Sequence, residues 1–311
     1  MTAPAIPAVG RSRAPATRRR GDRWEGIVNG WLRLHASLVY VFLYLPILVV
    51  ILFAFNSATV ATADWEGFSL RWFGIALDDD VVRTTLANSF IIAIPNAILA
   101  TVFGTMAALG LQQVGRKLRM TFDVLTYMSV IVPEIVIALS TLVLFATSFD
   151  AINSSFRIKF TLGYPTVIAA HVLFNLSLVL LLVRARLAGM DRTYVEASAD
   201  LFATPWRTFV QITFPQLLPA IVAGFLLSFT FSFDDYVITS FVSGPGSQTL
   251  PLYIFGQTRQ GVTPLTNAVA AMMLLVTLTV LIAGQYVVGR NGRRAGTADD
   301  GMAGMIASQS G

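Results

Sequence analysis

The segment that organises this sequence, residues 196–206, reads EASADLFATPW and continues to ITFP at 212–215. It is polar and lies between long apolar runs. Asp191 precedes it and is expected to cap a helix, because its carboxylate can accept hydrogen bonds from free amides of the first turn. Thr204-Pro205 reads as a second cap, since proline costs no hydrogen bond at the first helical position. These local rules predict two short helices joined by a tight turn at residues 202–203.

The composition indicates an integral membrane protein. Of 311 residues, 55% are hydrophobic and 13% are charged, and the mean hydropathy is +0.68; ordinary soluble domains have about 25% charged residues. The chain has no cysteine and two histidines, His35 and His171, which lie far apart in the sequence. A thiolate metal site, a cysteine nucleophile and a metal enzyme are therefore not expected, and a net charge of +5 is weak support for a nucleic-acid partner.

Six apolar runs each approach the ~20 residues needed to cross a ~30 Å hydrocarbon core, and lipid allows them to span only as helices. The fold class is thus all-α, with six transmembrane helices. Pro46, Pro95 and Pro133 predict kinks within them, and Gly104 suits close helix packing. The predicted spans are residues 37–57, 86–111, 122–147, 164–183, 217–241 and 265–288.

Lys and Arg are distributed unevenly between the two sides of these spans. Seventeen of the 22 lie in the N-terminal tail, the 112–121 and 184–216 connections and the C-terminal tail, and five lie in the remaining connections. Because cytoplasmic loops are enriched in Lys and Arg, both termini and the loop at 190–216 are predicted to be cytoplasmic. The resulting organisation is a basic disordered tail at 1–36, a first span and outer loop at 37–83, a transmembrane domain at 84–290 and a cytoplasmic tail at 291–311.

The arginine-rich start of the chain has a second interpretation, as a twin-arginine or secretory signal. The apolar run that follows is too long for the hydrophobic region of such a signal. Residues 61–63 resemble a cleavage site, so processing stays open as an alternative to the disordered tail.

The loop also carries the spacing of a known motif. It resembles the EAA motif of the membrane subunits of ATP-binding-cassette (ABC) importers, which reads Glu-Ala-Ala, three residues, Gly, nine residues, Ile, one residue, Leu-Pro. Ser198 stands for the second Ala, Phe202 for the Gly and Phe214 for the Leu. The residues expected to form the ATPase-coupling loop are Glu196, Ala197, Ser198, Asp200, Phe202, Ala203, Ile212 and Pro215.

The resemblance covers roughly residues 84–290 and is greatest to the spermidine/putrescine importer permeases, although relatives that carry other small solutes share much of the pattern. The segments that carry it are Asn88-Ser89, Pro133-Glu134-Ile135-Val136, Ser232-Phe233-Asp234-Asp235-Tyr236, Phe241-Val242-Ser243-Gly244-Pro245 and Leu250-Pro251.

The resemblance implies a type I ABC importer permease in a bacterial inner membrane. Such a subunit works with two ATP-binding-cassette ATPase subunits, a second related permease and an extracytoplasmic substrate-binding protein. The chain has no Gly-x-x-x-x-Gly-Lys-Ser/Thr sequence, so it cannot cradle ATP phosphates in that way. It is therefore expected to bind no cofactor and to be no enzyme, with ATP and Mg²⁺ on the partner subunits.

Charged residues at membrane depth are functional-site hypotheses. Glu134, Asp234 and Asp235, with His171 as a polar companion, are predicted in the outer half of their spans, at about 1.5 Å per helical residue. Carboxylates there would offset part of the dehydration cost of a polyamine. We expect Glu134 and one of the two aspartates to line the pathway; alternatively, these groups hold kinked helices together, form an outer gate or contact the binding protein. Tyr236 and Trp72 are candidates for cation–π contacts.

Phe202 is the most unusual residue of the coupling loop, because a bulky residue is an outlier where a glycine would take positive φ. Either the turn is built differently, or Phe202 is an apolar plug for an ATPase surface, which is our hypothesis.

Two other classes of function are alternatives to a permease subunit. An ion-coupled secondary transporter or channel would use the same carboxylates but gives no reason for the loop. A membrane enzyme lacks a catalytic constellation.

Overall fold

The computed structural model describes residues 21–59, 64–156, 159–191 and 193–309. This part of the chain is helical, with one isolated bridge between Asn56 and Phe68. Six of its helices are long and apolar enough to cross a membrane, as predicted from the apolar runs. The chain divides into two units, residues 1–50 and 51–311.

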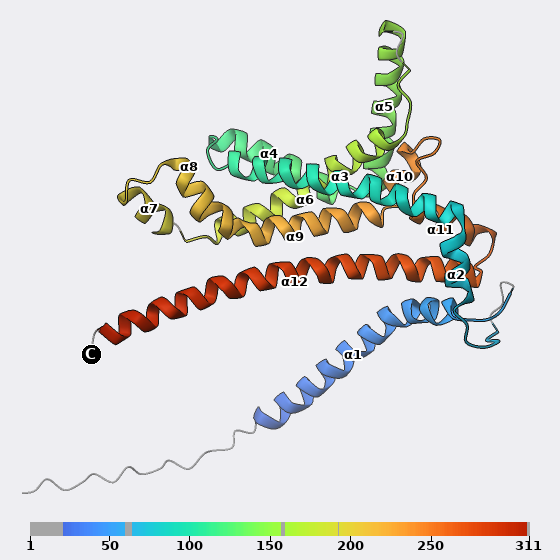
Figure 1. Cartoon of the computed structure of the whole chain (residues 1–311), viewed down its shortest axis with the longest axis horizontal. Coiled ribbons are helices and arrows are strands. Elements are labelled where there is room, and N and C mark those ends of the chain that lie inside the picture. Colours follow the sequence, from blue (N-terminus) through green and yellow to red (C-terminus); the bar gives the residue numbers. More distant parts are fainter. Residues whose placement is uncertain (1–20, 60–63, 157–158, 192, 310–311) are drawn as a thin grey trace, which may run out of the picture. The chain divides into compact units, whose positions relative to one another are not determined.

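The first unit is formed by α1 (Gly21–Ala54), which continues just beyond it (Figure 1). The predicted tail at 1–20 and the cleavage-like residues 61–63 lie outside the described residues. Residues 21–36, predicted as disordered tail, are helical instead. Apolar residues recur there at 24, 27, 28, 31 and 32, the spacing of one helix face, and the span of α1 begins at Val28.

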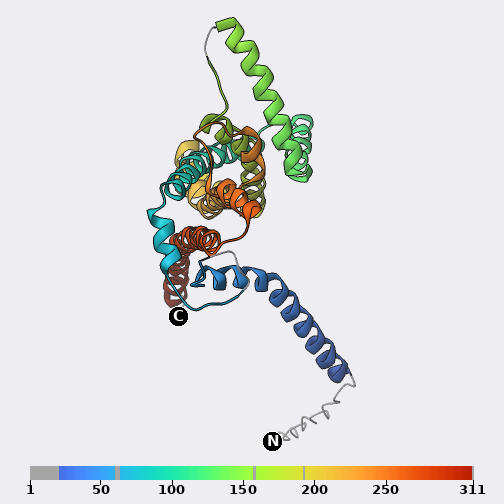
Figure 2. The same ribbon diagram turned by 90° about the vertical axis from the view of Figure 1, so that its right-hand side faces the viewer.

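The second unit is a helical bundle (Figure 1, Figure 2). Its helices α3, α6 and α9 pack together. The elements in chain order are α2 (Arg71–Asp78), α3 (Asp80–Gly110), α4 (Arg116–Ile131), α5 (Glu134–Phe156), α6 (Tyr164–Ala188), α7 (Thr193–Asp200), α8 (Pro205–Thr208), the π-helical turn η1 (Phe209–Thr213), α9 (Phe214–Phe233), α10 (Val237–Val242), α11 (Leu250–Gln260) and α12 (Pro264–Gln309).

Small residues let α3, α6 and α9 approach closely. A Cβ added to Gly104 on α3 would lie 2.8 Å from the Cβ of Val179 on α6, and one added to Gly224 on α9 would lie 3.2 Å from Cγ1 of the same valine. Val179 is fully buried and belongs to the apolar core of these helices. The predicted packing role of Gly104 is thus confirmed.

The third predicted span, residues 122–147, does not form one kinked helix, so this prediction is wrong. α4 ends at Ile131, and α5 begins at Glu134 after an extended Val132. Proline removes a backbone donor and disfavours helical geometry in the preceding residue, so Pro133 breaks the helix rather than bending it. The membrane-length helix is Glu134–Ser154, which places Glu134 at a helix start.

The fifth predicted span, residues 217–241, is interrupted as well. α9 ends at Phe233, and the short α10 begins at Val237. Both aspartates of the predicted pathway therefore lie in a break between helices. Such non-helical backbone is stable at membrane depth only where protein groups or water satisfy its polar atoms.

The loop at residues 243–249 is attached to the third turn of α3 and to the first turn of α6. The Asn88 side-chain amide donates to the carbonyls of Gly246 (3.0 Å) and Gln248 (2.8 Å) and accepts from the Tyr164 hydroxyl (2.7 Å). A Cβ on Gly244 would overlap the Leu162 carbonyl. These contacts explain why amide and glycine residues occur at these positions.

Candidate functional site

The coupling loop contains the two short helices that the sequence predicts. Asp191 Oδ1 accepts from the Thr193 amide at 2.9 Å, at the start of α7. Hydrogen bonds from the Thr193 hydroxyl and amide hold the pKa of the Asp191 carboxyl below its usual value. Thr204 caps α8, its hydroxyl accepting from the Arg207 amide at 3.4 Å, with Pro205 at the first helical position. Both caps are confirmed.

The turn between α7 and α8 has the geometry of a glycine-type helix terminus. The Phe202 amide donates to the Ala199 carbonyl (2.9 Å) and the Ala203 amide to the Ser198 carbonyl (3.0 Å). This pair of bonds defines a Schellman motif, in which Phe202 occupies the position that usually holds Gly. Phe202 accordingly has φ +56°. The alternative that the turn is built differently is therefore wrong. The backbone keeps the left-handed conformation that glycine usually adopts at this position, and Phe202 adopts it despite the steric strain of a positive φ.

Ser198 joins the two helices of the loop. Its buried hydroxyl lies 2.9 Å from the Thr208 hydroxyl on α8 and donates to the Val195 carbonyl at 2.7 Å. An alanine at position 198 could make neither bond. The replacement of the second Ala of the motif thus supplies a polar link that holds α7 on α8.

Between α8 and α9 the chain forms a single π-turn, η1. The Phe214 amide donates to the Phe209 carbonyl five residues back. Pro215 follows in the first turn of α9, where it cannot donate and its ring would crowd the carbonyl four residues before it. A π-turn is a common accommodation of such a break. Ile212, half-buried in η1, and the exposed Pro215 mark this junction.

The loop exposes large apolar side chains. Leu201 is 82% exposed, Phe202 94% and Trp206 73%. We call these three residues the apolar tip. On α7, Glu196, Ala197 and Asp200 are also exposed, whereas Ala203 is half-buried. An apolar tip beside a polar helix face is a surface suited to a protein partner.

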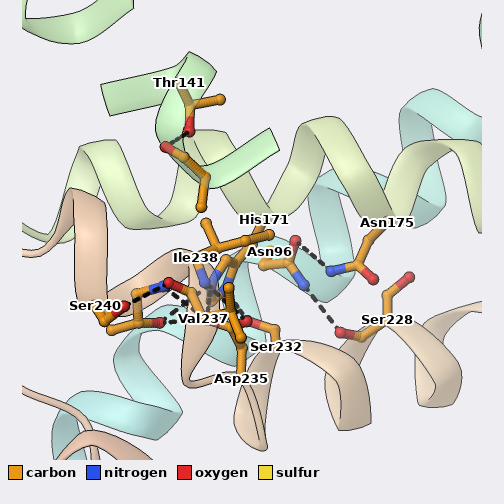
Figure 3. A network of polar contacts seen from close by, with 12 residues as sticks. Asn96, Thr141, His171, Asn175, Ser228, Ser232, Asp235, Val237, Ile238 and Ser240 are labelled. Carbon is orange, nitrogen blue, oxygen red and sulfur yellow. Dashed lines mark hydrogen bonds and ion pairs between the residues drawn. The ribbon is translucent and has the colours of Figure 1, made fainter. Parts of the chain in front are cut away.

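A second cluster surrounds His171, which is 1% exposed on α6 (Figure 3). His171 Nδ1 lies 2.7 Å from the Ser232 hydroxyl, and Nε2 lies 3.1 Å from Asp235 Oδ2. Asp235 also accepts from the Thr239 amide and hydroxyl, both at 2.7 Å. Asp235 therefore caps the first turn of α10 and ties it to α6.

Glu134 lies at the edge of this cluster. It is half-buried at the first residue of α5, and its carboxyl group neighbours that of Asp235. The structure thus brings together three predicted residues, Glu134, His171 and Asp235, from α5, α6 and the break before α10. Of the three, only Glu134 retains substantial access to solvent.

Asp234 does not join them. Its Oδ1 accepts from the Thr277 hydroxyl on α12 at 3.2 Å, and with Tyr236 it lines a cavity beside α11 and α12. Trp72 also lies elsewhere, with the Arg71 guanidinium 5.3 Å from its ring centroid. The two adjacent aspartates, treated as interchangeable at the sequence level, therefore face different neighbours.

Hydrogen bonds from two side-chain amides join α3, α6 and α9, and the sequence analysis did not predict them. The Asn96 side chain donates to the Ser228 carbonyl at 3.0 Å and accepts from Asn175 at 3.3 Å (Figure 3). The sequence does contain an indication of this contact, because Asn96 and Asn175 each interrupt an apolar run. Ser232 and Thr239, which support His171 and Asp235, were missed for lack of any spacing that distinguishes them.

The part of the chain that contains the coupling loop and the His171 cluster is similar to known proteins. Residues 100–294 match the family model described as binding-protein-dependent transport system inner membrane component. The putrescine transport system permease protein PotI of Escherichia coli is 39% identical over 78% of this chain and 85% of its own length. The spermidine/putrescine transport system permease protein PotC of the same organism is 32% identical over 85% of this chain and 95% of its own.

The fold is also shared with solved structures. A chain of a bacterial ABC transporter involved in the import of the acidic polysaccharide alginate superposes with a TM-score of 0.69. The match covers 86% of this chain and 99% of that one, at 14% identity. Likeness at that identity establishes a common helical architecture.

Proposed function

The chain belongs to the inner membrane components of binding-protein-dependent transport systems, and from that premise we propose that it forms part of the pathway of an ATP-driven polyamine importer. The observation that carries the proposal is 39% and 32% identity, over most of the chain, to permeases for putrescine and for spermidine and putrescine. The His171 cluster, with a solvent-accessible carboxylate at its edge, supports a cationic solute. Another small organic solute of the same importer class is the alternative.

The proposed assembly contains two ATPase subunits, a second related permease and an extracytoplasmic binding protein. ATP and Mg²⁺ belong to the ATPases, and this chain binds neither. The excess of Lys and Arg in the connections supports cytoplasmic termini and a cytoplasmic coupling loop in the bacterial inner membrane.

The coupling loop is proposed to dock in an ATPase cleft through α7 and the apolar tip. Glu196 would anchor α7 by polar contacts, and the Phe202 ring would enter an apolar pocket. The link from Ser198 to Thr208 makes α7 and α8 move together, and η1 connects α8 to α9. ATPase closure would therefore tilt α9 and α6, the spans that flank the loop.

Glu134 is proposed as the carboxylate that meets the solute. Asp235 already accepts from His171, Thr239 and Ile238, so it is engaged in holding α10, and we assign it and His171 a positioning role. A single accessible carboxylate offsets part of the dehydration of an ammonium group and still lets the solute leave.

The test is spermidine and putrescine uptake into proteoliposomes that contain the assembled importer. We expect uptake to require ATP and the binding protein, and Glu134→Gln to slow it at least tenfold. Asp80→Asn is the matched control, because Asp80 is a highly exposed carboxylate paired with Arg83. Wild-type importer that carries neither polyamine would overturn the proposed substrate class. Equal rates for Glu134→Gln and Asp80→Asn would overturn the role of Glu134.

A further inference from the structure

The ends of α3 and α6 and one face of α4 border a cavity of about 480 Å³, a volume within the ~300–1,000 Å³ typical of small-molecule sites. We call it the basic cavity. α3 and α6 line it with the last residues of their membrane-length segments, which end at Gly110 and Ala188. A site at the ends of two spanning helices lies at the depth of the lipid headgroups. From this cavity, α6 leads directly into the coupling loop.

Arg119 of α4 is held on the wall of the basic cavity by the end of α3. Its Nε donates to the Leu111 carbonyl and its Nη2 to the Gln112 carbonyl, both at 2.9 Å. The guanidinium thereby offsets the partial negative charge of that helix end. A guanidinium has five N–H donors, so three remain after these two bonds. In the part of the chain that the structure describes, no carboxylate oxygen lies within 4 Å of Arg119.

Arg184 of α6 faces the same cavity. Its Nη1 pairs with Asp123 of α4, which fixes the guanidinium through one nitrogen, and Asp123 is not part of the cavity lining. The surrounding segments, residues 112–131 and 181–188, contain five basic residues and one acidic residue. The cavity therefore presents two ordered guanidinium groups in a positively charged region, which favours an anionic ligand with several acceptor oxygens.

The outer face of α4 is apolar. Leu118, Phe122 and Leu125 are 49%, 42% and 56% exposed, and their spacing of four and three residues places them on one side of the helix. Tyr127, which is exposed and lines the cavity, is a residue type enriched at membrane interfaces. An anionic group in the cavity thus has an apolar helix surface beside it, a combination that suits a headgroup with acyl chains better than a free anion.

We propose that the basic cavity binds the headgroup phosphate of an anionic phospholipid. Arg119 and Arg184 donate to the phosphate oxygens, and the acyl chains lie along Leu118 and Leu125. Basic pockets between membrane helices on the cytoplasmic side suit such headgroups. The inference goes beyond the proposed function and takes from it only the cytoplasmic orientation, which selects the leaflet. A lipid bound here would brace the end of α6, the helix that leads into α7.

The test is native mass spectrometry of the purified full chain in maltoside micelles, which resolves chains with and without bound lipid. Phosphatidylglycerol is the anionic probe. Phosphatidylcholine with the same acyl chains, which has a phosphate but no net charge, is the reference. We expect phosphatidylglycerol to bind at least fivefold more tightly. Arg119→Gln should raise its dissociation constant at least fivefold, as expected for one basic group at an anionic membrane surface.

Two further variants separate the cavity from diffuse positive charge. Lys117→Gln removes the same charge from an exposed residue of α4 outside the lining, and binding should stay within twofold of the parent chain. Ala185→Phe fills the cavity from an exposed lining position without changing the charge, and it should weaken binding about as much as Arg119→Gln. If Arg119→Gln melts early because it uncaps α3, Ala185→Phe decides the question alone.

Equal binding of the two lipids, or equal losses in Lys117→Gln and Arg119→Gln, would overturn the site. Unchanged binding in Ala185→Phe would overturn it as well. Displacement of phosphatidylglycerol by millimolar inorganic phosphate would assign the cavity to a free anion and overturn the lipid. Because the measurement needs neither transport nor ATP, its failure leaves the proposed function standing, and an importer that carries no polyamine leaves this site standing.

Discussion

Replacing Phe202 by glycine separates two roles that this residue combines. Its φ of +56° carries a cost of about 1–2 kcal/mol for an L-residue. Glycine removes that strain but loses about 0.5–1 kcal/mol more conformational entropy on folding. The free energy of unfolding of the isolated chain should therefore change by less than about 1.5 kcal/mol. A thermal melt in detergent should show little change or a slight rise.

Binding to the ATPase should respond in the opposite direction. Burying a phenylalanine side chain contributes about 1.5–3 kcal/mol, and the ring is 94% exposed in the free chain, so nearly all of that remains available to a partner. Phe202→Gly should raise the dissociation constant for the ATPase subunit by about 10- to 150-fold.

Phe202→Ala is the matched variant, because it removes the ring and keeps a side chain in the strained conformation. If the ring is the contact, both variants lose affinity equally, as measured by biolayer interferometry with the importer's own ATPase. An unchanged dissociation constant for Phe202→Gly would refute the apolar-plug hypothesis. Loss of affinity in Phe202→Gly alone would show that turn geometry, rather than the ring, governs docking.

Substitutions at three further positions test how the α9–α10 break and the loop at residues 243–249 are held, and each is measured as a thermal melt of the purified chain. Gly244→Ala should lower the free energy of unfolding by about 1–3 kcal/mol, since the new methyl overlaps the Leu162 carbonyl; an unchanged melt would contradict the close approach. Asn88→Ala should cost about 1–3 kcal/mol. Asn88→Asp should cost at least as much, because it keeps an acceptor for Tyr164 but places a buried carboxylate oxygen against the Gly246 and Gln248 carbonyls. Asp235→Ala should lower the free energy of unfolding by about 3–5 kcal/mol, because it leaves buried His171 without its carboxylate partner. A loss below about 1 kcal/mol would argue against an interaction between His171 and Asp235.

Much of the helical architecture follows from local rules. Six membrane-length helices follow from apolar runs, and both caps of the coupling loop follow from Asp191 and Thr204-Pro205. These features depend on residues within one or two turns of each other, which is why the sequence is enough to predict them. The amphipathic spacing that extends α1 back toward Trp24 was equally local, but the arginines around it suggested a disordered tail.

The two broken spans could not be located from hydropathy, because an apolar run does not record whether a helix continues through it. At Pro133 the choice between a kink and a break depends on the neighbours that satisfy the freed carbonyls. Asp234 and Asp235 show the same limit at the site. Adjacent carboxylates in a helix would have pointed about 100° apart on one segment, yet the non-helical break directs one to α6 and the other to α12. Only the packing of distant helices decides that separation.

The most direct test of the central claim is ATP-dependent spermidine uptake by proteoliposomes that hold this permease with its partner permease and ATPases, supplied with binding protein outside. We predict accumulation that stops without ATP, without the binding protein, and in a Glu196→Ala variant whose α7 has lost its proposed anchor. Uptake that proceeds at the same rate without the ATPase subunits would contradict the assignment and point to an ion-coupled carrier.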